Sequence, residues 1–85
     1  MLSRDEVQAV VFKLASELFE LEADELTEDK DIVEDFAASS VMRLEYLVML
    51  ERKFGFKFDI ARVEDTGRFR ELIDLVMEQL ARRAS

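Results

Sequence analysis

Apolar residues recur every three or four positions near the start of the chain. The members of this first stripe are Val7, Val11, Leu14, Leu18 and Leu21. They share one face of a helix with about 3.6 residues per turn, so the pattern predicts a helix over residues 3–21. Ser3 and Glu6 match a capping box, in which two residues satisfy each other's free backbone amides, and they indicate where this helix begins.

A second apolar stripe predicts a helix from Ser40 to about Phe54. The residues expected to face inward are Val41, Leu44, Leu47, Val48 and Phe54. Ser39 suits the N-cap, because a serine hydroxyl accepts a hydrogen bond from an amide two or three residues later. Gly55 suits the C-terminal end, because glycine adopts the left-handed backbone conformation at low cost.

A third stripe predicts a helix near the end of the chain. Its buried face is expected to consist of Phe69, Leu72, Ile73, Val76 and Leu80. Thr66 is a candidate for its cap. Arg82 and Arg83 lie near its C-terminus, where cations complement the helix dipole.

The connections between these helices are less regular. Residues 22–38 are acidic and aperiodic, and we expect them to be pinned to the helices by Leu26, Ile32, Val33 and Phe36, with a helical turn near Ile32. Residues 56–60 alternate like a strand, but no second strand is predicted to pair with them. We therefore expect an extended loop that inserts Phe56 and Phe58 into the core, followed by a short helix over residues 60–65.

Together these elements predict an all-α fold, a four-helix bundle with a long first loop and a short third helix. A chain of 85 residues, 49% apolar and 38% charged, suits a single domain over residues 1–85 with one core. It contains no apolar run near the roughly 20 residues of a membrane span and no recognisable signal peptide. We expect a cytoplasmic monomer that does not enter membranes.

The charge is acidic and unevenly distributed. The net charge is −8. Residues 1–40 hold twelve acids and three bases, a net of −9, whereas residues 41–85 hold eight acids and nine bases, a net of +1. Nucleic acid and anionic membranes are therefore unfavourable partners, and a protein with a basic patch is favoured.

Most catalytic and metal-binding chemistry is excluded by composition. The chain has no histidine and no cysteine, so it lacks the commonest general base and the commonest zinc ligands. With two glycines it has no glycine-rich phosphate loop. The acidic run at residues 24–35 lacks the glycine-centred frame of an EF-hand and is interpreted as a solvated loop rather than a calcium site. We expect no metal and no catalytic activity.

Two adjacent serines at the start of the second predicted helix call for an explanation, because a cap needs only Ser39. Ser40 is no hydrolase nucleophile in a chain without histidine. A helix N-terminus exposes free amides and partial positive charge, which favour a phosphate. Ser40 is therefore well placed either to be phosphorylated by another enzyme or to carry a group that another enzyme attaches through a phosphate.

The serine pair and the segments around it resemble the acyl carrier protein family. Ser39-Ser40-Val41 lies where the family has Asp-Ser-Leu at the start of its second helix. The other matching segments are ELT at 25–27, VEDF at 33–36, SSVMRLEYLVMLERKFGFKF at 39–58 and the stripe over 69–76. The resemblance implies that Ser40 bears a covalent 4′-phosphopantetheine arm from coenzyme A, whose thiol carries an acyl or aminoacyl group as a thioester. Ser39 keeps the capping role of the family's aspartate but not its charge.

The resemblance also implies partners: a phosphopantetheinyl transferase, an acyl- or aminoacyl-loading enzyme, and downstream synthase or transferase enzymes. They are expected to dock around Ser40, on a surface that includes Glu34, Asp35, Val41, Met42, Arg43, Glu45, Tyr46 and Glu51. This mixture of charges points away from a generic fatty-acid carrier and toward a dedicated polyketide- or peptide-type pathway. The alternative is an unmodified acidic helical adaptor that binds a basic protein.

Overall fold

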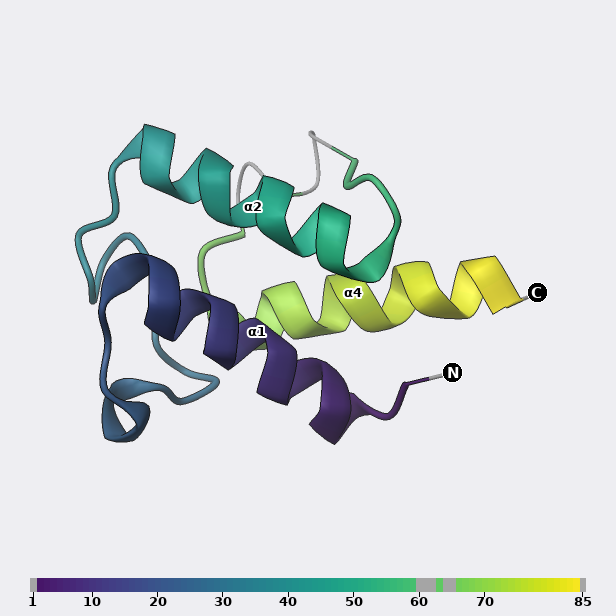
Figure 1. The fold of residues 1–85 in the computed structure, drawn as a ribbon, viewed down its shortest axis with the longest axis horizontal. Coiled ribbons are helices and arrows are strands. Elements are labelled where there is room, and N and C mark those ends of the chain that lie inside the picture. The colour runs from purple at the N-terminus through teal and green to yellow at the C-terminus, as the bar shows by residue number, and fades with distance from the viewer. Residues whose placement is uncertain (1, 60–62, 64–65, 85) are drawn as a thin grey trace.

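The computed structural model describes residues 2–59, 63 and 66–84. The described residues form three α-helices, α1 (Arg4–Phe19), α2 (Ser40–Phe54) and α4 (Phe69–Ala84), and one 3-10 turn, η1 (Ala23–Glu25). Helix α1 packs against both α2 and α4 and runs opposite to them, as Figure 1 shows. Apart from an isolated bridge between Asp31 and Arg68, no β-structure occurs in these residues. The all-α prediction is confirmed.

The predicted short helix over residues 60–65 lies mostly outside the described residues. Of that segment only Val63 is described; it is helical, and its amide donates to the carbonyl of Asp59 at 3.2 Å. Before it, residues 56–59 form a loop, as predicted. Phe58 is buried and Phe56 half-buried, and their rings meet edge to face with centroids 5.0 Å apart.

The helix ends follow local chemistry. The Ser3 hydroxyl accepts from the Glu6 amide at 3.2 Å, and the Glu6 carboxylate accepts from the Ser3 amide at 3.0 Å, so the predicted capping box is present. Its hydrogen bonds lower the pKa of Glu6. At the C-terminal end of α2, Gly55 adopts the left-handed conformation with φ of 77°, as predicted. Arg83 of α4 donates to the carbonyl of Phe54 at 2.7 Å and so satisfies a free acceptor at the end of α2.

The buried stripe of α4 is nearly as predicted, whereas that of α2 is not. Four of the five stripe residues of α4 are fully buried, and Leu80 is half-buried. In α2, Leu47 and Phe54 are buried as predicted, but Val41 and Leu44 are 66% and 63% exposed. The remaining buried residues of α2 are Tyr46 and Leu50.

The error in α2 has a geometric cause. At about 100° per residue, positions 41, 44 and 48 lie on one side of the helix, and positions 46, 47, 50 and 54 lie on roughly the opposite side. Both sides carry apolar residues, so periodicity alone cannot choose between them. The packing of α2 against α1 buries the second side.

An aromatic cluster fills the centre of the core. The ring of Phe69 meets those of Phe12, Tyr46 and Phe36 with centroids 5.4, 6.5 and 6.2 Å apart. Phe19 meets Tyr46 edge to face at 5.4 Å. These contacts join all three helices and the loop between α1 and α2, because Phe36 comes from that loop.

The α1–α2 loop, residues 20–39, is held against α4 by its backbone. The carbonyls of Lys30 and Glu28 accept from the amides of Phe69 and Arg70 at 3.0 and 2.9 Å, which satisfies the first turn of α4. Thr66, expected to cap this helix, instead lies buried three residues before it begins. Of the predicted pins, Ile32 is fully buried and Leu26 and Phe36 are half-buried, but Val33 is 45% exposed.

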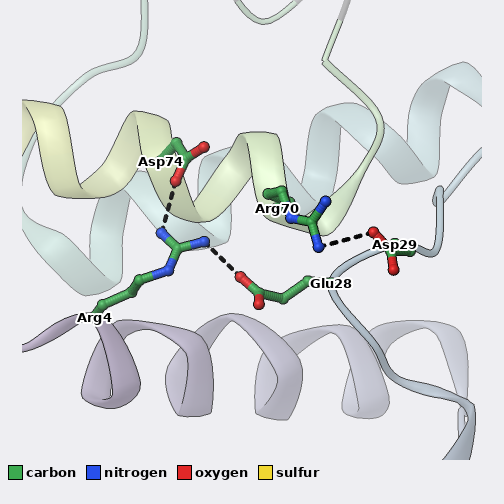
Figure 2. A network of polar contacts seen from close by, with 5 residues as sticks. All are labelled: Arg4, Glu28, Asp29, Arg70 and Asp74. Atoms are coloured by element: carbon green, nitrogen blue, oxygen red, sulfur yellow. Dashed lines mark hydrogen bonds and ion pairs between the residues drawn. The ribbon is translucent and has the colours of Figure 1, made fainter.

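Ion pairs add to this attachment. Figure 2 shows Arg4 of α1 between Glu28 of the loop and Asp74 of α4, and Arg70 of α4 beside Asp29. The nitrogen–oxygen distances are 2.5 Å for Arg4–Glu28, 2.6 Å for Arg4–Asp74 and 2.9 Å for Arg70–Asp29. Burial opposes the charge of Arg4, but the bonds to Asp74 and Glu28 raise its pKa. These side chains are partly exposed, so each pair contributes at most about 1 kcal/mol. The backbone hydrogen bonds and the buried side chain of Ile32 therefore contribute most to holding the α1–α2 loop against α4.

Candidate functional site: the start of helix α2

The two serines have different structural roles. Ser39 is the N-cap of α2: its hydroxyl accepts from the Met42 amide at 3.2 Å, and its carbonyl accepts from the Arg43 amide at 2.9 Å. This confirms the predicted cap. Ser40 is the first helical residue and is exposed, and its hydroxyl makes no hydrogen bond within the described part of the chain. Ser40 therefore offers a hydroxyl that the fold does not use.

The backbone before the serines fixes their position. Ala38 is buried, and its amide donates to the carbonyl of Ile32 at 3.0 Å. The amide of Ile32 in turn donates to the carbonyl of Gly67 at 3.0 Å. Ala37, between loop and helix, is left-handed with φ of 54°. The start of α2 is thus connected through Ile32 to the segment that precedes α4.

The start of α2 is electrostatically suited to an anion. Its first turn contains no acidic residue. The amides of Ser40 and Val41 have no acceptor among the described residues, as expected for the first residues of a helix beyond the one satisfied by the cap. A phosphate on Ser40 would meet these donors and the positive end of the helix dipole.

A close contact between Gly67 and the side chain of Asp31 was not predicted. A Cβ atom added to Gly67 would lie 2.7 Å from both carboxylate oxygens of Asp31. Oδ1 of that carboxylate accepts from the amides of Val33 and Glu34 at 2.8 and 3.1 Å and so shapes the turn that carries Glu34 and Asp35. Gly67 therefore has a steric requirement that depends on a residue far away in the sequence.

The structure divides the predicted docking residues into three groups. Glu34, Asp35, Val41 and Glu45 are exposed. Met42, Arg43 and Glu51 are half-buried, and Tyr46 is fully buried. Two of the carboxylates also serve the backbone: Asp35 accepts from the Asp31 amide at 2.7 Å and Glu51 from the Phe58 amide at 2.6 Å.

Tyr46 does not lie on the surface, contrary to expectation. Its hydroxyl donates to the carbonyl of Val11 in α1 at 2.7 Å. Burial raises the pKa of Tyr46 well above its ordinary value. A single tyrosine in an amphipathic helix gives no sign of which side it faces, and here the carbonyl of Val11 supplies the partner that a buried hydroxyl needs.

The exposed apolar side of α2 was also not predicted. Leu44, Val48 and Met49 line a groove of about 370 Å³ together with Glu45 and Arg52. This groove begins one helical turn after Ser40. Its sequence signal is the pair Leu44 and Val48, which the apolar periodicity places in the core but the structure places along the groove.

Neither a cluster of metal ligands nor a helix able to cross a membrane occurs among the described residues. They contain no group of three or more acidic, histidine or cysteine side chains that could hold a metal ion. No helix formed by the described residues has both the length and the apolar character needed to cross a membrane.

Comparisons with known proteins agree with this geometry. A family model described as a phosphopantetheine attachment site matches residues 9–76. The chain is 25% identical over 80 residues to an acyl carrier protein of Thermotoga maritima, covering 94% of this chain and 99% of that one. It is 28% identical over 68 residues to polyketide-8 synthase acyl carrier protein 2 of Streptomyces avermitilis, covering 80% and 78%.

A solved structure of acyl carrier protein from Enterococcus faecalis is also similar. It superposes with a TM-score of 0.78 at 28% identity, covering 91% of this chain and 98% of that one.

Proposed function

The chain belongs to the acyl carrier protein family, and on that premise we propose that Ser40 is the residue that bears its 4′-phosphopantetheine. Members of this family carry acyl groups on the covalently attached arm, and this chain does so too. The family match therefore favours the carrier function over the alternative of an unmodified adaptor. The following proposals concern the atom of attachment, the partners and the pathway.

The observation that supports Ser40 is the contrast with its neighbour. The hydroxyl of Ser39 is engaged with the Met42 amide, whereas that of Ser40 is exposed and makes no bond in the described residues. The free amides of Ser40 and Val41 suit a phosphodiester at this position. The hydroxyl oxygen of Ser40 therefore needs no rearrangement of the helix to react.

The attachment reaction is a phosphoryl transfer catalysed by a separate transferase. Oγ of Ser40 attacks the phosphorus of coenzyme A that is bonded to pantetheine, and a new P–O bond forms. The bond from this phosphorus to the bridging oxygen breaks, and adenosine 3′,5′-bisphosphate leaves. The hydroxyl proton passes to a general base that the transferase supplies. The attached thiol supplies the sulfur that a chain without cysteine lacks.

The chain itself catalyses none of these steps. It presents a tethered cargo to the enzymes that load, extend or release it, at a high effective concentration. We propose that residues 1–85 act as one carrier domain.

We infer that partners dock on a surface next to Ser40 that combines acidic and apolar groups. Its exposed members are Glu34, Asp35, Val41, Leu44 and Glu45. Two exposed apolar residues within one turn of Ser40 favour partners that bury apolar area there. No acid occupies the first turn of α2, and Arg52 and Lys53 occupy its last. This mixture supports a dedicated polyketide- or peptide-type pathway over a generic fatty-acid one.

Mass spectrometry tests the attachment site. The wild type and the Ser39→Ala and Ser40→Ala variants are incubated with coenzyme A and a broad-specificity phosphopantetheinyl transferase. The wild type and Ser39→Ala should gain the mass of one arm, and Ser40→Ala should gain none. Peptide mapping then locates the arm. An arm on Ser39, or on Ser40→Ala protein, would show that the assignment is wrong.

A further inference from the structure

Arg43 makes contacts that a docking residue would not need. Its side chain leaves α2 three residues after Ser40, and its guanidinium Nη2 donates to the carbonyls of Val63 and Thr66, the second at 3.0 Å. Both carbonyls belong to buried residues of the segment that precedes α4. They are 20 and 23 residues away along the chain.

The position of this arginine is unfavourable for the helix itself. A cation near a helix N-terminus meets the positive end of the dipole, so Arg43 does not stabilise α2 by its charge. A guanidinium that donates to carbonyl oxygens instead forms charge-assisted hydrogen bonds, which are stronger than neutral ones. The two N–H groups of Nη2 can serve two acceptors at once, here the carbonyls of Val63 and Thr66. Arg43 therefore stabilises the contact of α2 with Val63 and Thr66, not the helix itself.

These contacts complete a closed path around the attachment site. From Arg43 the path runs to the carbonyl of Thr66 and to its chain neighbour Gly67. The carbonyl of Gly67 accepts from the Ile32 amide at 3.0 Å. The carbonyl of Ile32 accepts from the amide of Ala38 at 3.0 Å, and Ala38 directly precedes Ser39. Arg43 is the side chain through which α2 closes this path.

We propose that Arg43 is a positioning residue: it holds Val63 and Thr66 against the first turn of α2, and thereby fixes the surface beside Ser40 that partner enzymes meet. This inference rests on the proposed function, because it concerns access to Ser40. It replaces the expectation that Arg43 contacts partners through its charge. A charge contact weakens with salt, whereas a positional role does not.

The structural half of the proposal is tested by amide hydrogen exchange on the unmodified protein. The variants are Arg43→Gln, Arg43→Lys and the matched control Lys53→Gln, an exposed cation at the far end of α2. In Arg43→Gln, the amides of Thr66, Ile32 and Ala38 should exchange about tenfold faster than in the wild type, because lost charged hydrogen bonds ease local opening. The amide of Leu72, in the core of α4, should change much less. Arg43→Lys should be intermediate, and Lys53→Gln should match the wild type.

The functional half is tested by the kinetics of phosphopantetheinyl transfer at low and high ionic strength. Arg43→Gln should raise the KM for the carrier by about tenfold at both salt concentrations, with little change in kcat, because the acceptor hydroxyl is intact. Arg43→Lys should recover part of the loss. If Arg43→Gln is too unstable to assay, Arg43→Lys alone should still show faster exchange at Thr66 and a salt-independent rise in KM.

Three results would overturn the proposal. These are unchanged exchange at Thr66 in Arg43→Gln, faster exchange with unchanged KM, and a KM penalty that disappears at high salt. None of them concerns where the arm is attached. An arm that mapped to a residue other than Ser40 in the wild type would instead contradict the proposed function, and the exchange measurement would stand independently of it.

Discussion

The hydroxyl of Tyr46 in α2 donates a hydrogen bond to the backbone carbonyl of Val11 in α1, across 2.7 Å, in the interior of the protein. The ring lies between Phe19 and Phe69 with edge-to-face contacts. Tyr46 therefore fixes the distance and the rotation of α2 relative to α1. That rotation decides which side of α2 faces solvent near Ser40.

Removal of this hydroxyl should weaken the fold without affecting docking. Tyr46→Phe should lose about 1 kcal/mol of unfolding free energy, the net value of one hydrogen bond. The denaturant midpoint measures this loss. The rate of phosphopantetheinyl transfer should be unchanged under conditions where both proteins are folded. A variant of full stability with slower transfer would place Tyr46 in the docking surface instead.

The same residue should make the fold sensitive to alkali. Burial raises the pKa of Tyr46 in the folded state, so the folded protein keeps its phenol proton when the unfolded chain loses it. The stabilisation is complete below the unfolded pKa of about 10 and is lost above it, by up to about 1.4 kcal/mol per pH unit. The control is Tyr46→Phe, which keeps the lysines but lacks this phenol. Unfolding free energies measured from pH 8 to about 11 should fall more steeply for the wild type, and equal slopes would contradict the argument.

Gly67 should not tolerate a side chain. Its backbone is not left-handed, so conformational strain is no reason to require glycine, and the contact with Asp31 is the reason. Gly67→Ala should cost about 1–3 kcal/mol, as is usual for overpacking at a site with little freedom to adjust. Thermal denaturation measures the loss. In an Asp31→Ala background, which removes the obstructing carboxylate, the same substitution should cost less, and strict additivity of the two changes would exclude the steric explanation.

The cap and the attachment site should separate by mutation. Ser39→Ala should reduce the unfolding free energy by about 1 kcal/mol, since the Met42 amide loses its acceptor. Ser40→Ala should change stability by less than about 0.5 kcal/mol, because its hydroxyl is exposed. Chemical denaturation of both unmodified variants tests this difference. A larger loss for Ser40→Ala would mean that Ser40 supports the helix in a way the hydrogen bonds do not reveal.

Partner enzymes should depend on the exposed apolar side of α2. Val41→Ser and Leu44→Ser should leave stability within about 0.5 kcal/mol of the wild type, since both residues are mainly exposed. Each should nevertheless raise the KM of a cognate loading enzyme several-fold, and the effect should persist at high salt because apolar contacts are not screened. Leu2→Ser is the control, an exposed leucine that precedes α1 and is not part of α2. Unchanged kinetics for Val41→Ser and Leu44→Ser would leave the acidic residues as the main docking determinants.

The start of α1, both ends of α2 and the buried face of α4 follow from local sequence patterns, whereas α1 ends at Phe19, two residues before the predicted end at Leu21. Ser3, Ser39 and Gly55 act over distances of a few residues, so their roles depend on neighbours that the sequence already specifies. Helix α4 carries one dominant apolar stripe from Phe69 to Leu80, so its orientation was not in doubt. The place of Ser40 at the start of α2 follows from the same local chemistry.

Which side of α2 is buried, and which loop residues anchor the site, depend on tertiary packing. The two apolar sides of α2 are equivalent until α1 packs against one of them through Tyr46. Ile32 and Val33 differ little as side chains, and the hydrogen bonds to Gly67 and Ala38 select Ile32 for the interior. Arg43 has the sequence signature of a surface charge because its acceptors lie 20 and 23 residues away. Such contacts form between groups that are distant in the chain, and no local pattern encodes them.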